Sequence, residues 1–323
     1  MKLDVRQIVN LRGIGTPACA VLLLALPALV HASTYYVTIA GLGGEPEYEQ
    51  RFAMWAKDID KLVRTAGPTD KVETLTGAAA TKAKIESVLG QIAKEAKPAD
   101  ALVLMMVGHG TFDGAEYKFN LPGPDLSGSE LATLLNRIPT TRQLVVNMTS
   151  ASGGSRAALE KTNRAIITAT RGGTEKNATI FARYWVEALR DPAADTDKND
   201  TISALEAFRY AEQKTAKFYE TQKRLATEHA MLGDTGKGTG VKNPSAANGE
   251  GLVASRISVI KIGSAQTATA TPEKQKLIVH KEDLEQQIDA LKYQKAAIPL
   301  DQYKRQLSGL LLELAKTQAE LDK

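Results

Sequence analysis

The sequence is poor in cysteine and in aromatic residues. One cysteine among 323 residues excludes an intramolecular disulfide framework and any zinc site with several cysteine ligands. Aromatic residues make up 5% of the chain, too few to favour the base-stacking platforms of single-strand nucleic-acid binding. The 41 basic and 37 acidic residues nearly balance, which argues against nucleic acid or an anionic membrane as the main partner.

Long apolar runs are also scarce, and the most apolar one stands near the N-terminus. Residues 18–30 follow a basic start and precede small residues that a signal peptidase reads. This run is short for a bilayer span of about 20 residues, and Pro27 interrupts it, so a membrane anchor is the less favoured alternative. The pattern predicts a signal peptide over residues 1–32, cleaved after Ala32, and a periplasmic or secreted protein without stable membrane insertion.

From residue 35 onward, strand-like and helix-like patterns alternate. Continuous apolar runs at 101–107, 143–148 and 164–170 are typical of strands buried on both faces. Segments with apolar residues at helical spacing separate them, which implies parallel crossovers. The sequence therefore predicts a three-layer α/β/α sandwich with a mostly parallel sheet over residues 33–263. The segment 252–262 is expected to add a strand to that sheet.

The C-terminal part has a different composition. Residues 264–274 are predicted to form a small-residue linker. Residues 275–323 carry leucines at helical spacing on both sides of a break at Pro299, which predicts an α-helical hairpin or a coiled-coil tail. This tail packs either on the α/β domain or on another chain, as part of an oligomer or a complex with a partner.

A histidine between two glycines directly follows the first of the buried runs. In such a sheet the chemistry lies beyond the carboxyl ends of the strands, so His109 and Gly110 stand at the expected edge. The glycines give a ligand close access, and an imidazole suits general acid–base work near neutral pH. Asp113 is the nearest candidate to orient the imidazole. The alternative is a loop histidine without a catalytic role.

A run of small residues follows the second buried strand. Its sequence is Thr-Ser-Ala-Ser-Gly-Gly, residues 149–154. The backbone N–H groups of such a turn suit an oxyanion pocket, and Ser150 or Ser152 is a candidate nucleophile. The alternative is a plain turn with a helix cap, where serine and glycine are common.

The two clusters together resemble the caspase–legumain clan of cysteine peptidases, including its bacterial members, over roughly residues 34–262. In that clan a His-Gly pair follows one central strand, and a cysteine in a D-A-C-x-S-G type stretch follows the next. His109-Gly110 matches the first motif. Ser152-Gly153 matches the S-G of the second, which puts Ser150 at the nucleophile position. The resemblance implies His109 and Ser150 as the catalytic pair; the backbone N–H of Gly110 would stabilise an oxyanion.

The nucleophilic cysteine of that clan is missing here. Cys19 lies in the leader, so no cysteine remains after cleavage, and Met148 replaces the usual acidic residue of the motif. A serine hydroxyl is far less acidic than a thiol and needs a well-aligned base. The sequence therefore predicts an exported pseudo-peptidase that binds a peptide or protein. The alternative is an active hydrolase with a Ser150–His109 dyad; neither requires a cofactor.

A third cluster, within residues 195–206, fits the twelve-position spacing of a calcium loop. Position six is Asp200 instead of the usual glycine. The alternative is an acidic turn that caps the next helix through a capping box. If calcium binds, its ligands are Asp195, Asp197, Asn199, Thr201, Ser203 and Glu206.

Overall fold

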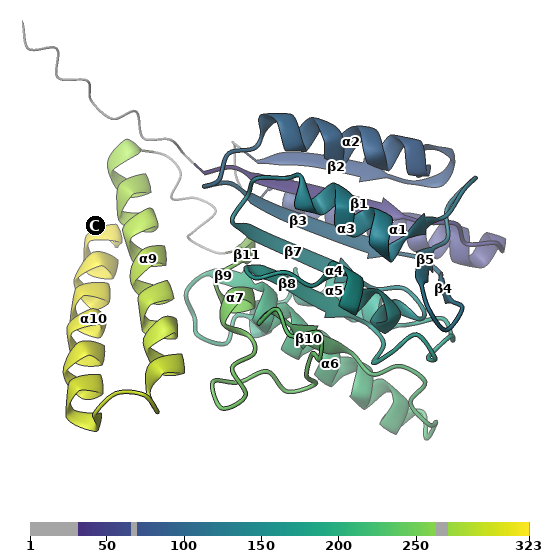
Figure 1. Ribbon diagram of the computed structural model, residues 1–323. Helices are drawn as coiled ribbons and strands as arrows, with labels where there is room; N and C mark the ends of the chain where they lie inside the picture. The colour runs from purple at the N-terminus through teal and green to yellow at the C-terminus, as the bar shows by residue number, and fades with distance from the viewer. Residues whose placement is uncertain (1–31, 66–69, 263–270, 323) are drawn as a thin grey trace, which may run out of the picture. The chain divides into compact units, whose positions relative to one another are not determined.

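The computed structural model describes residues 32–65, 70–262 and 271–322. The predicted signal peptide, apart from Ala32, and most of the predicted linker lie outside these residues. Six strands form the central sheet in the order β10-β8-β7-β3-β1-β2 (Figure 1). Adjacent strands are parallel except for β10, which runs antiparallel to β8. The strands are β1 Thr34–Ala40, β2 Lys71–Leu75, β3 Ala101–Val107, β7 Arg142–Asn147, β8 Arg164–Thr168 and β10 Met231–Gly233.

The register brings the carboxyl ends of the central strands to one edge. Met106 of β3 pairs with Asn147 of β7, and Asn147 pairs with Thr168 of β8. Every residue of β3 and of β8 is buried, as their continuous apolar character predicts. The segments that follow β3, β7 and β8 therefore leave the sheet side by side.

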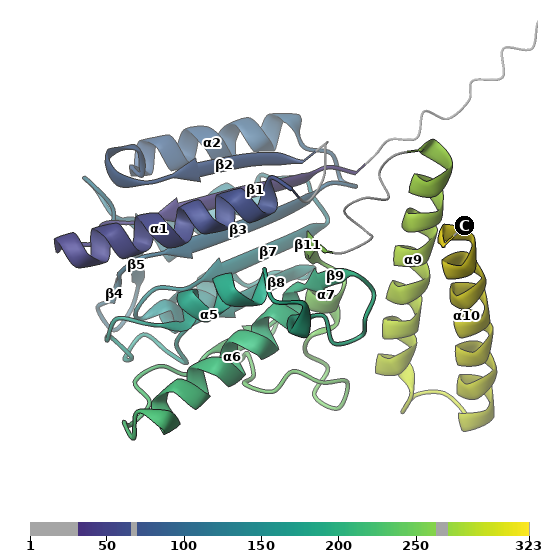
Figure 2. The same cartoon turned by 180° about the vertical axis from the view of Figure 1, so that it is seen from behind.

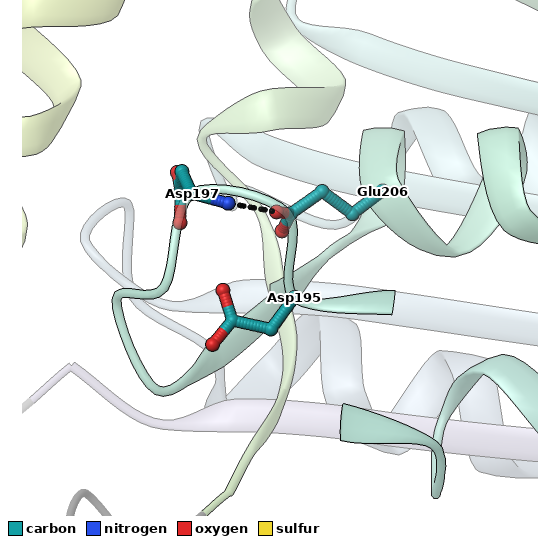
Figure 3. Close-up of side chains that lie close together, drawn as sticks. All are labelled: Asp195, Asp197 and Glu206. Carbon is teal, nitrogen blue, oxygen red and sulfur yellow. Dashed lines mark hydrogen bonds between the residues drawn. The ribbon is translucent and has the colours of Figure 1, made fainter. Parts of the chain in front are cut away.

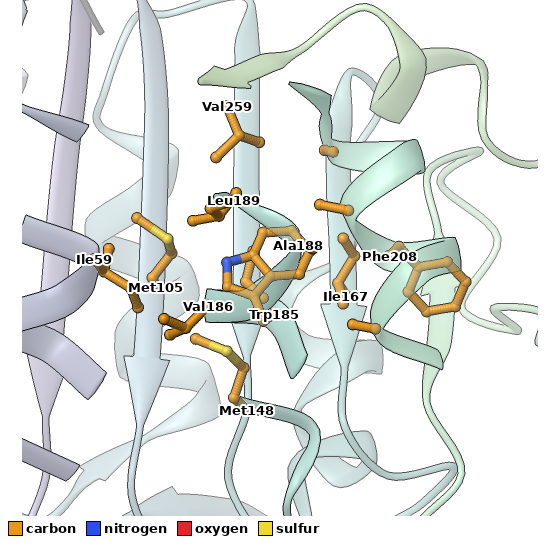
Figure 4. Close-up of a cluster of buried hydrophobic side chains, with 14 of the residues drawn as sticks. Ile59, Met105, Met148, Ile167, Trp185, Val186, Ala188, Leu189, Phe208 and Val259 are labelled. Carbon is orange, nitrogen blue, oxygen red and sulfur yellow. The ribbon is translucent and has the colours of Figure 1, made fainter. Parts of the chain in front are cut away.

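Helices cover both faces of the sheet, so the predicted three-layer α/β/α sandwich with a mostly parallel sheet is confirmed. One layer holds α1 Pro46–Val63, α5 Phe181–Ala188 and α6 Ala204–Thr221, seen in front of the sheet in Figure 2. The other holds α2 Lys82–Glu95, α3 Gly128–Asn136 and the short α4 Arg156–Leu159. In the first core, Trp185 of α5 packs among aliphatic and methionine side chains of the sheet (Figure 4). Burying each such large side chain contributes about 1.5–3 kcal/mol.

The structure contains a small sheet that the sequence pattern does not predict, and one expected strand lies elsewhere. The Gly/Pro-rich stretch after β3 forms a small antiparallel sheet of β4 Gly110–Phe112, β5 Tyr117–Phe119 and β6 Leu126–Ser127. The prediction that 252–262 joins the central sheet is wrong. Its first part is the helix α7 Leu252–Ser255, and its second part, β11 Ser258–Lys261, pairs with β9 Thr201–Ser203. The edge strands of the central sheet are β2 and β10, and β11 belongs with β9 to a separate two-stranded sheet.

The C-terminal segment forms the predicted helical hairpin, α9 Pro272–Gln294 and α10 Leu300–Leu321. The first helix begins inside the segment expected as linker. It buries Leu284, Ile288 and Leu291, and Tyr293 donates a 2.8 Å hydrogen bond to the carbonyl of Glu250. These contacts attach α9 to the α/β domain. Among the described residues, no helix is both long and apolar enough to cross a membrane.

Candidate functional site

The two motif segments meet at the carboxyl edge of the sheet, through Gly110 and Ser150. The Ser150 hydroxyl donates to the carbonyl of Gly110 at 3.1 Å and accepts from the N–H of the same residue at 3.1 Å. Ser150 is 2% exposed. Its oxygen is therefore enclosed and occupied on both its donor and its acceptor side.

Glycine at position 110 allows this close approach. A Cβ atom there would lie 2.5 Å from the ring of Tyr117 and 2.6 Å from the carbonyl oxygen of Ser150. Contacts of that length do not occur in folded proteins, so only glycine lets the backbone of β4 reach the turn after β7. The N–H of Gly110, which was expected to stabilise an oxyanion, instead donates its hydrogen bond to the hydroxyl of Ser150.

The turn after β7 is strained at the residue that follows Ser150. Ala151 has a φ of 54°, in the left-handed region that a residue with a Cβ rarely adopts. Its N–H donates to the carbonyl of Glu175 at 2.8 Å, which ties this turn to the turn after β8. Such strain persists only where surrounding contacts hold the turn, and the hydrogen bond to Glu175 is one of them.

The other candidate nucleophile is also engaged. Ser152 is fully buried, its hydroxyl lies 3.2 Å from that of Thr170, and it accepts from the N–H of Thr170 at 3.1 Å. Both candidate serines thus act as hydrogen-bonding residues between neighbouring turns.

His109 lies at the same edge but faces another direction. Its ring packs edge-on against Tyr48 and Phe52 of α1, with centroid distances of 4.7 and 5.1 Å. Burial lowers the pKa of His109 below its usual value, although a hydrogen bond to the Gly43 backbone and two nearby glutamates oppose the shift. Within the described part of the chain, no hydrogen bond joins this ring to Ser150.

Asp113 is committed to its own turn. Its carboxylate accepts from the N–H groups of Ala115 and Glu116, at 2.9 and 2.8 Å, and the residue is exposed. These bonds lower the pKa of Asp113. The structure thus brings Ser150 and Gly110 together, whereas His109 and Asp113 each hydrogen-bond or pack elsewhere.

Two features at this edge were not found from the sequence. Glu175 and His229 form a pair, with Oε1 and Nδ1 2.6 Å apart, and Glu175 Oε2 also accepts from the N–H of Arg171. The ring of Phe112, from β4, lies against Gly154 and Gly173. Both contacts join segments far apart in the chain, and no spacing in the sequence signals them.

The third cluster forms a compact loop between α5 and α6. Asp195, Asp197 and Glu206 each place a carboxylate oxygen within 4.8 Å of the others, an arrangement able to hold a metal ion (Figure 3). Asp195 and Glu206 are buried. Asp200, at the sixth position, has a φ of 66°, the left-handed conformation for which calcium loops usually use glycine.

The capping alternative is present in the same loop. Ser203 and Glu206 form a complete capping box at the start of α6, so each accepts from the other's backbone N–H. The other oxygen of Glu206 accepts from the N–H and hydroxyl of Thr196, at 2.8 and 2.9 Å. The carboxylate of Glu206 therefore organises the loop whether or not an ion is bound.

Crowded carboxylates give this loop an unusual electrostatic character. Partial desolvation, reinforced by Glu206 and Asp195, raises the pKa of Asp197 to about 7. The first helix of the hairpin contacts the loop directly. Lys281 donates to the carbonyl of Asn199 at 3.2 Å, and the amide of Asn199 donates to Glu285 at 3.3 Å.

No family model matches the chain, and no curated protein matches it either. Solved structures do match. The Drosophila initiator caspase Dronc aligns at 9% identity over 63% of this chain and 80% of its own, with a TM-score of 0.43. Caspase-1 from Spodoptera frugiperda aligns at 14% identity over 63% and 86%, with a TM-score of 0.43. A protein from Geobacter sulfurreducens aligns at 14% identity over 67% and 96%, with a TM-score of 0.44.

Proposed function

We propose that this chain is an exported, caspase-like pseudo-peptidase whose sheet edge binds a peptide or protein without cleaving it. The hydrogen bonding of Ser150 carries the proposal. Catalysis by a serine requires its hydroxyl to donate to a base and to reach a carbonyl carbon. Here the hydroxyl donates to the Gly110 carbonyl, and the imidazole of His109 packs against α1 instead.

A peptide-hydrolysis assay on the chain from Ser33 to Lys323 tests this proposal. The unmodified protein is compared with Ser150→Ala and His109→Ala on a library of fluorogenic peptides. Equal background turnover in all three supports a pseudo-peptidase. Robust turnover that both substitutions abolish would establish the alternative, an active hydrolase with a Ser150–His109 dyad.

Export to the periplasm or the medium is the second part of the proposal. It is supported by the basic, then apolar, then small-residue order of residues 1–32. Mass analysis of the protein from a cell with a general secretion system tests it. A mature N-terminus at Ser33 is expected, and an uncleaved chain in the cytoplasm would contradict it.

Calcium binding by the loop before α6 is a second candidate function. Three carboxylates within reach of one ion, two of them buried, support it. The oxygens of Asp195, Asp197, Asn199 and Glu206, together with the carbonyl of Thr201 and the hydroxyl of Ser203, would hold the ion. Bound calcium would neutralise the mutual repulsion of the carboxylates and fix the loop on which α9 rests.

The hairpin is proposed as the contact with another copy or partner chain. Three leucines of α10 remain exposed although both helices pack together: Leu300, Leu311 and Leu312. Light scattering of the unmodified chain against a Leu311→Lys, Leu312→Lys variant tests this. A lower molar mass in solution for the variant than for the unmodified chain indicates self-association through these leucines. A monomer in both cases limits the hairpin to binding a different protein.

A further inference from the structure

The last helix, α10, packs on α9 along one side only. Residues at alternating spacings of four and three, typical of a coiled-coil seam, are buried or half-buried there: Tyr303, Leu307, Leu310, Leu314, Thr317 and Leu321. Lys274 of α9 donates to the carbonyl of Leu321 at 3.3 Å, and His280 lies 3.1 Å from Glu313. These contacts fix α10 on α9 and leave its other side to solvent.

That exposed side of α10 is apolar at its centre. Leu311 and Leu312 are 47% and 60% exposed, and Leu300, nearer the start of the helix, is 57% exposed. Ser308 and Ala315, also exposed, stand three or four residues before and after the two central leucines. Residues at these spacings share one face of a helix, so the leucines lie between two small side chains, and another helix can approach closely there.

The arrangement of this face is self-complementary. The leucine pair stands near the middle of α10, which runs from Leu300 to Leu321. A two-fold interface places the same patch of both subunits together, so each patch must match itself. When a second α10 lies antiparallel across the leucines, Leu311 of one copy meets Leu312 of the other, and Ser308 meets Ala315. Large side chains then meet at the centre and small ones flank them on both sides.

The charges of α10 favour the same direction of pairing. Residues 300–310 carry a net charge of +1, and residues 311–322 carry a net charge of −2. The charged residues are Asp301, Lys304 and Arg305 in the first half and Glu313, Lys316, Glu320 and Asp322 in the second. Parallel helices would bring halves of like charge together, whereas antiparallel helices bring halves of unlike charge together. A second copy of α10 is therefore electrostatically matched to the first.

One charged pair follows from this register. With Leu311 opposite Leu312, Lys304 lies opposite Ala319 of the second copy and within one turn of its Asp322. Lys304 and Asp322 are both exposed, and Asp322 accepts from the amide of Gln318 in its own helix at 2.8 Å. Within one chain, 18 residues of helix place Lys304 and Asp322 about 27 Å apart. An interaction between Lys304 and Asp322 therefore forms only across two copies.

We propose that the exposed face of α10 is the contact surface of a homodimer, in which α10 of a second copy lies antiparallel across Leu311 and Leu312. This inference rests on the proposed role of the hairpin as a contact with another chain. It adds the identity of that chain, the direction of the two helices and their register. The dimer carries two copies of the proposed peptide-binding edge, so a partner with two binding segments is held more tightly than by one subunit.

Disulfide crosslinking tests the register, because residues 33–323 contain no cysteine. Two variants of the chain from Ser33 to Lys323, Ser308→Cys and Ala315→Cys, are mixed and mildly oxidised. The mixture is expected to form a covalent dimer that joins the two substituted positions. Each variant alone is the control and is expected to stay uncrosslinked, because its two copies of the substituted residue lie about 10 Å apart along the antiparallel helices.

A charge exchange gives a second, independent measurement. Sedimentation equilibrium at low ionic strength measures the dissociation constant of the dimer. Lys304→Glu and Asp322→Lys are each expected to raise it about tenfold, because each turns two attractive contacts into repulsive ones. The double variant restores opposite charges and is expected to return to within about threefold of the unmodified protein. Lys94→Glu, an exposed change on α2 with the same change in net charge as Lys304→Glu, is the control and should leave the constant unchanged.

The outcomes separate this inference from the proposed function. An unmodified chain that stays monomeric at high protein concentration, or a Ser308→Cys variant that crosslinks with itself, would overturn the inference. A double charge variant that associates as weakly as the two single variants would overturn the register. Peptide hydrolysis by the unmodified protein would instead defeat the proposed pseudo-peptidase, whatever the dimer measurements show.

Discussion

The hydroxyl of Ser150 and the backbone of Gly110 satisfy each other, with the oxygen 3.1 Å from both the N–H nitrogen and the carbonyl oxygen. Two segments separated by about 40 residues are joined there. The contact places the residue at the nucleophile position in a structural role, and it determines how β4 lies across the carboxyl edge of the sheet.

Replacing Ser150 by alanine is expected to destabilise the fold by about 1–3 kcal/mol, because it leaves the buried N–H and carbonyl of Gly110 without partners. Urea denaturation measures the free energy of unfolding. Ser308→Ala, an exposed change on α10, is the control and should stay within about 0.5 kcal/mol of the unmodified protein. If Ser150→Ala changed the free energy of unfolding as little as the control does, the contact with Gly110 would not contribute to stability.

The pKa of His109 is expected below its usual value near 6.5, because burial against Tyr48 and Phe52 disfavours the charged ring. The unfolded chain then binds the proton more readily than the folded one. The stability is complete above pH 6.5 and falls as the pH drops through that value towards the lower folded pKa. NMR titration of the imidazole measures the shift directly. A midpoint above 6.5 would show that the ring faces a carboxylate instead.

The effect of His109 protonation can also be followed through the free energy of unfolding. His109→Phe keeps an aromatic ring against α1 but cannot titrate. Between pH 7 and pH 5 the unmodified protein should lose more free energy of unfolding than this variant does. Parallel curves for the two proteins would rule out His109 as a source of acid sensitivity.

Two glycine-to-alanine substitutions are expected to act in opposite directions. Gly110→Ala pushes a methyl group into Tyr117 and the Ser150 carbonyl, which costs several kcal/mol or prevents folding. Gly90→Ala lies within α2, where an added Cβ meets nothing within 4 Å, and should stabilise by about 0.4–1 kcal/mol. Melting temperatures that move the same way for both would contradict the close packing described at Gly110.

Calcium is expected to raise the melting temperature of the unmodified protein, because an ion held only by the folded loop stabilises the folded state. Asp195→Ala and Glu206→Gln should remove this rise. Glu220→Gln, an exposed change on the same helix as Glu206, is the control and should keep it. A transition that is identical in excess calcium and in chelator would leave the capping box as the sole role of the loop.

Much of the architecture could be predicted because each buried strand is a continuous apolar run of distinctive composition. The apolar runs at β3 and β7 also show why His109 and Ser150 lie near the carboxyl edge, two residues after Val107 and three after Asn147. The small sheet β4-β5-β6 could not be predicted, since strands of two or three residues in a Gly-rich stretch carry no periodic signal. The segment 252–262 misled because its apolar residues suit a short helix followed by a strand as well as one long strand.

The side-chain contacts of the site were beyond prediction for a different reason. A motif fixes which residues follow a strand, but not the direction of their side chains. The hydroxyl of Ser150 had two partners within reach of such an edge, an imidazole and a backbone, and packing of His109 against Tyr48 and Phe52 decides between them. The packing of the Phe112 ring against Gly154 and Gly173 likewise depends on segments that meet only in the folded chain.

The most direct test of the central claim is the reactivity of Ser150 itself. The folded chain from Ser33 to Lys323 is incubated with a fluorophosphonate, which phosphonylates activated serines with loss of fluoride, and the modified residue is located by mass spectrometry. Because its hydroxyl is buried and bonded to Gly110, Ser150 is expected to remain unmodified at concentrations that label a serine hydrolase completely. Stoichiometric labelling of Ser150, abolished in His109→Ala, would contradict the account and identify an active hydrolase.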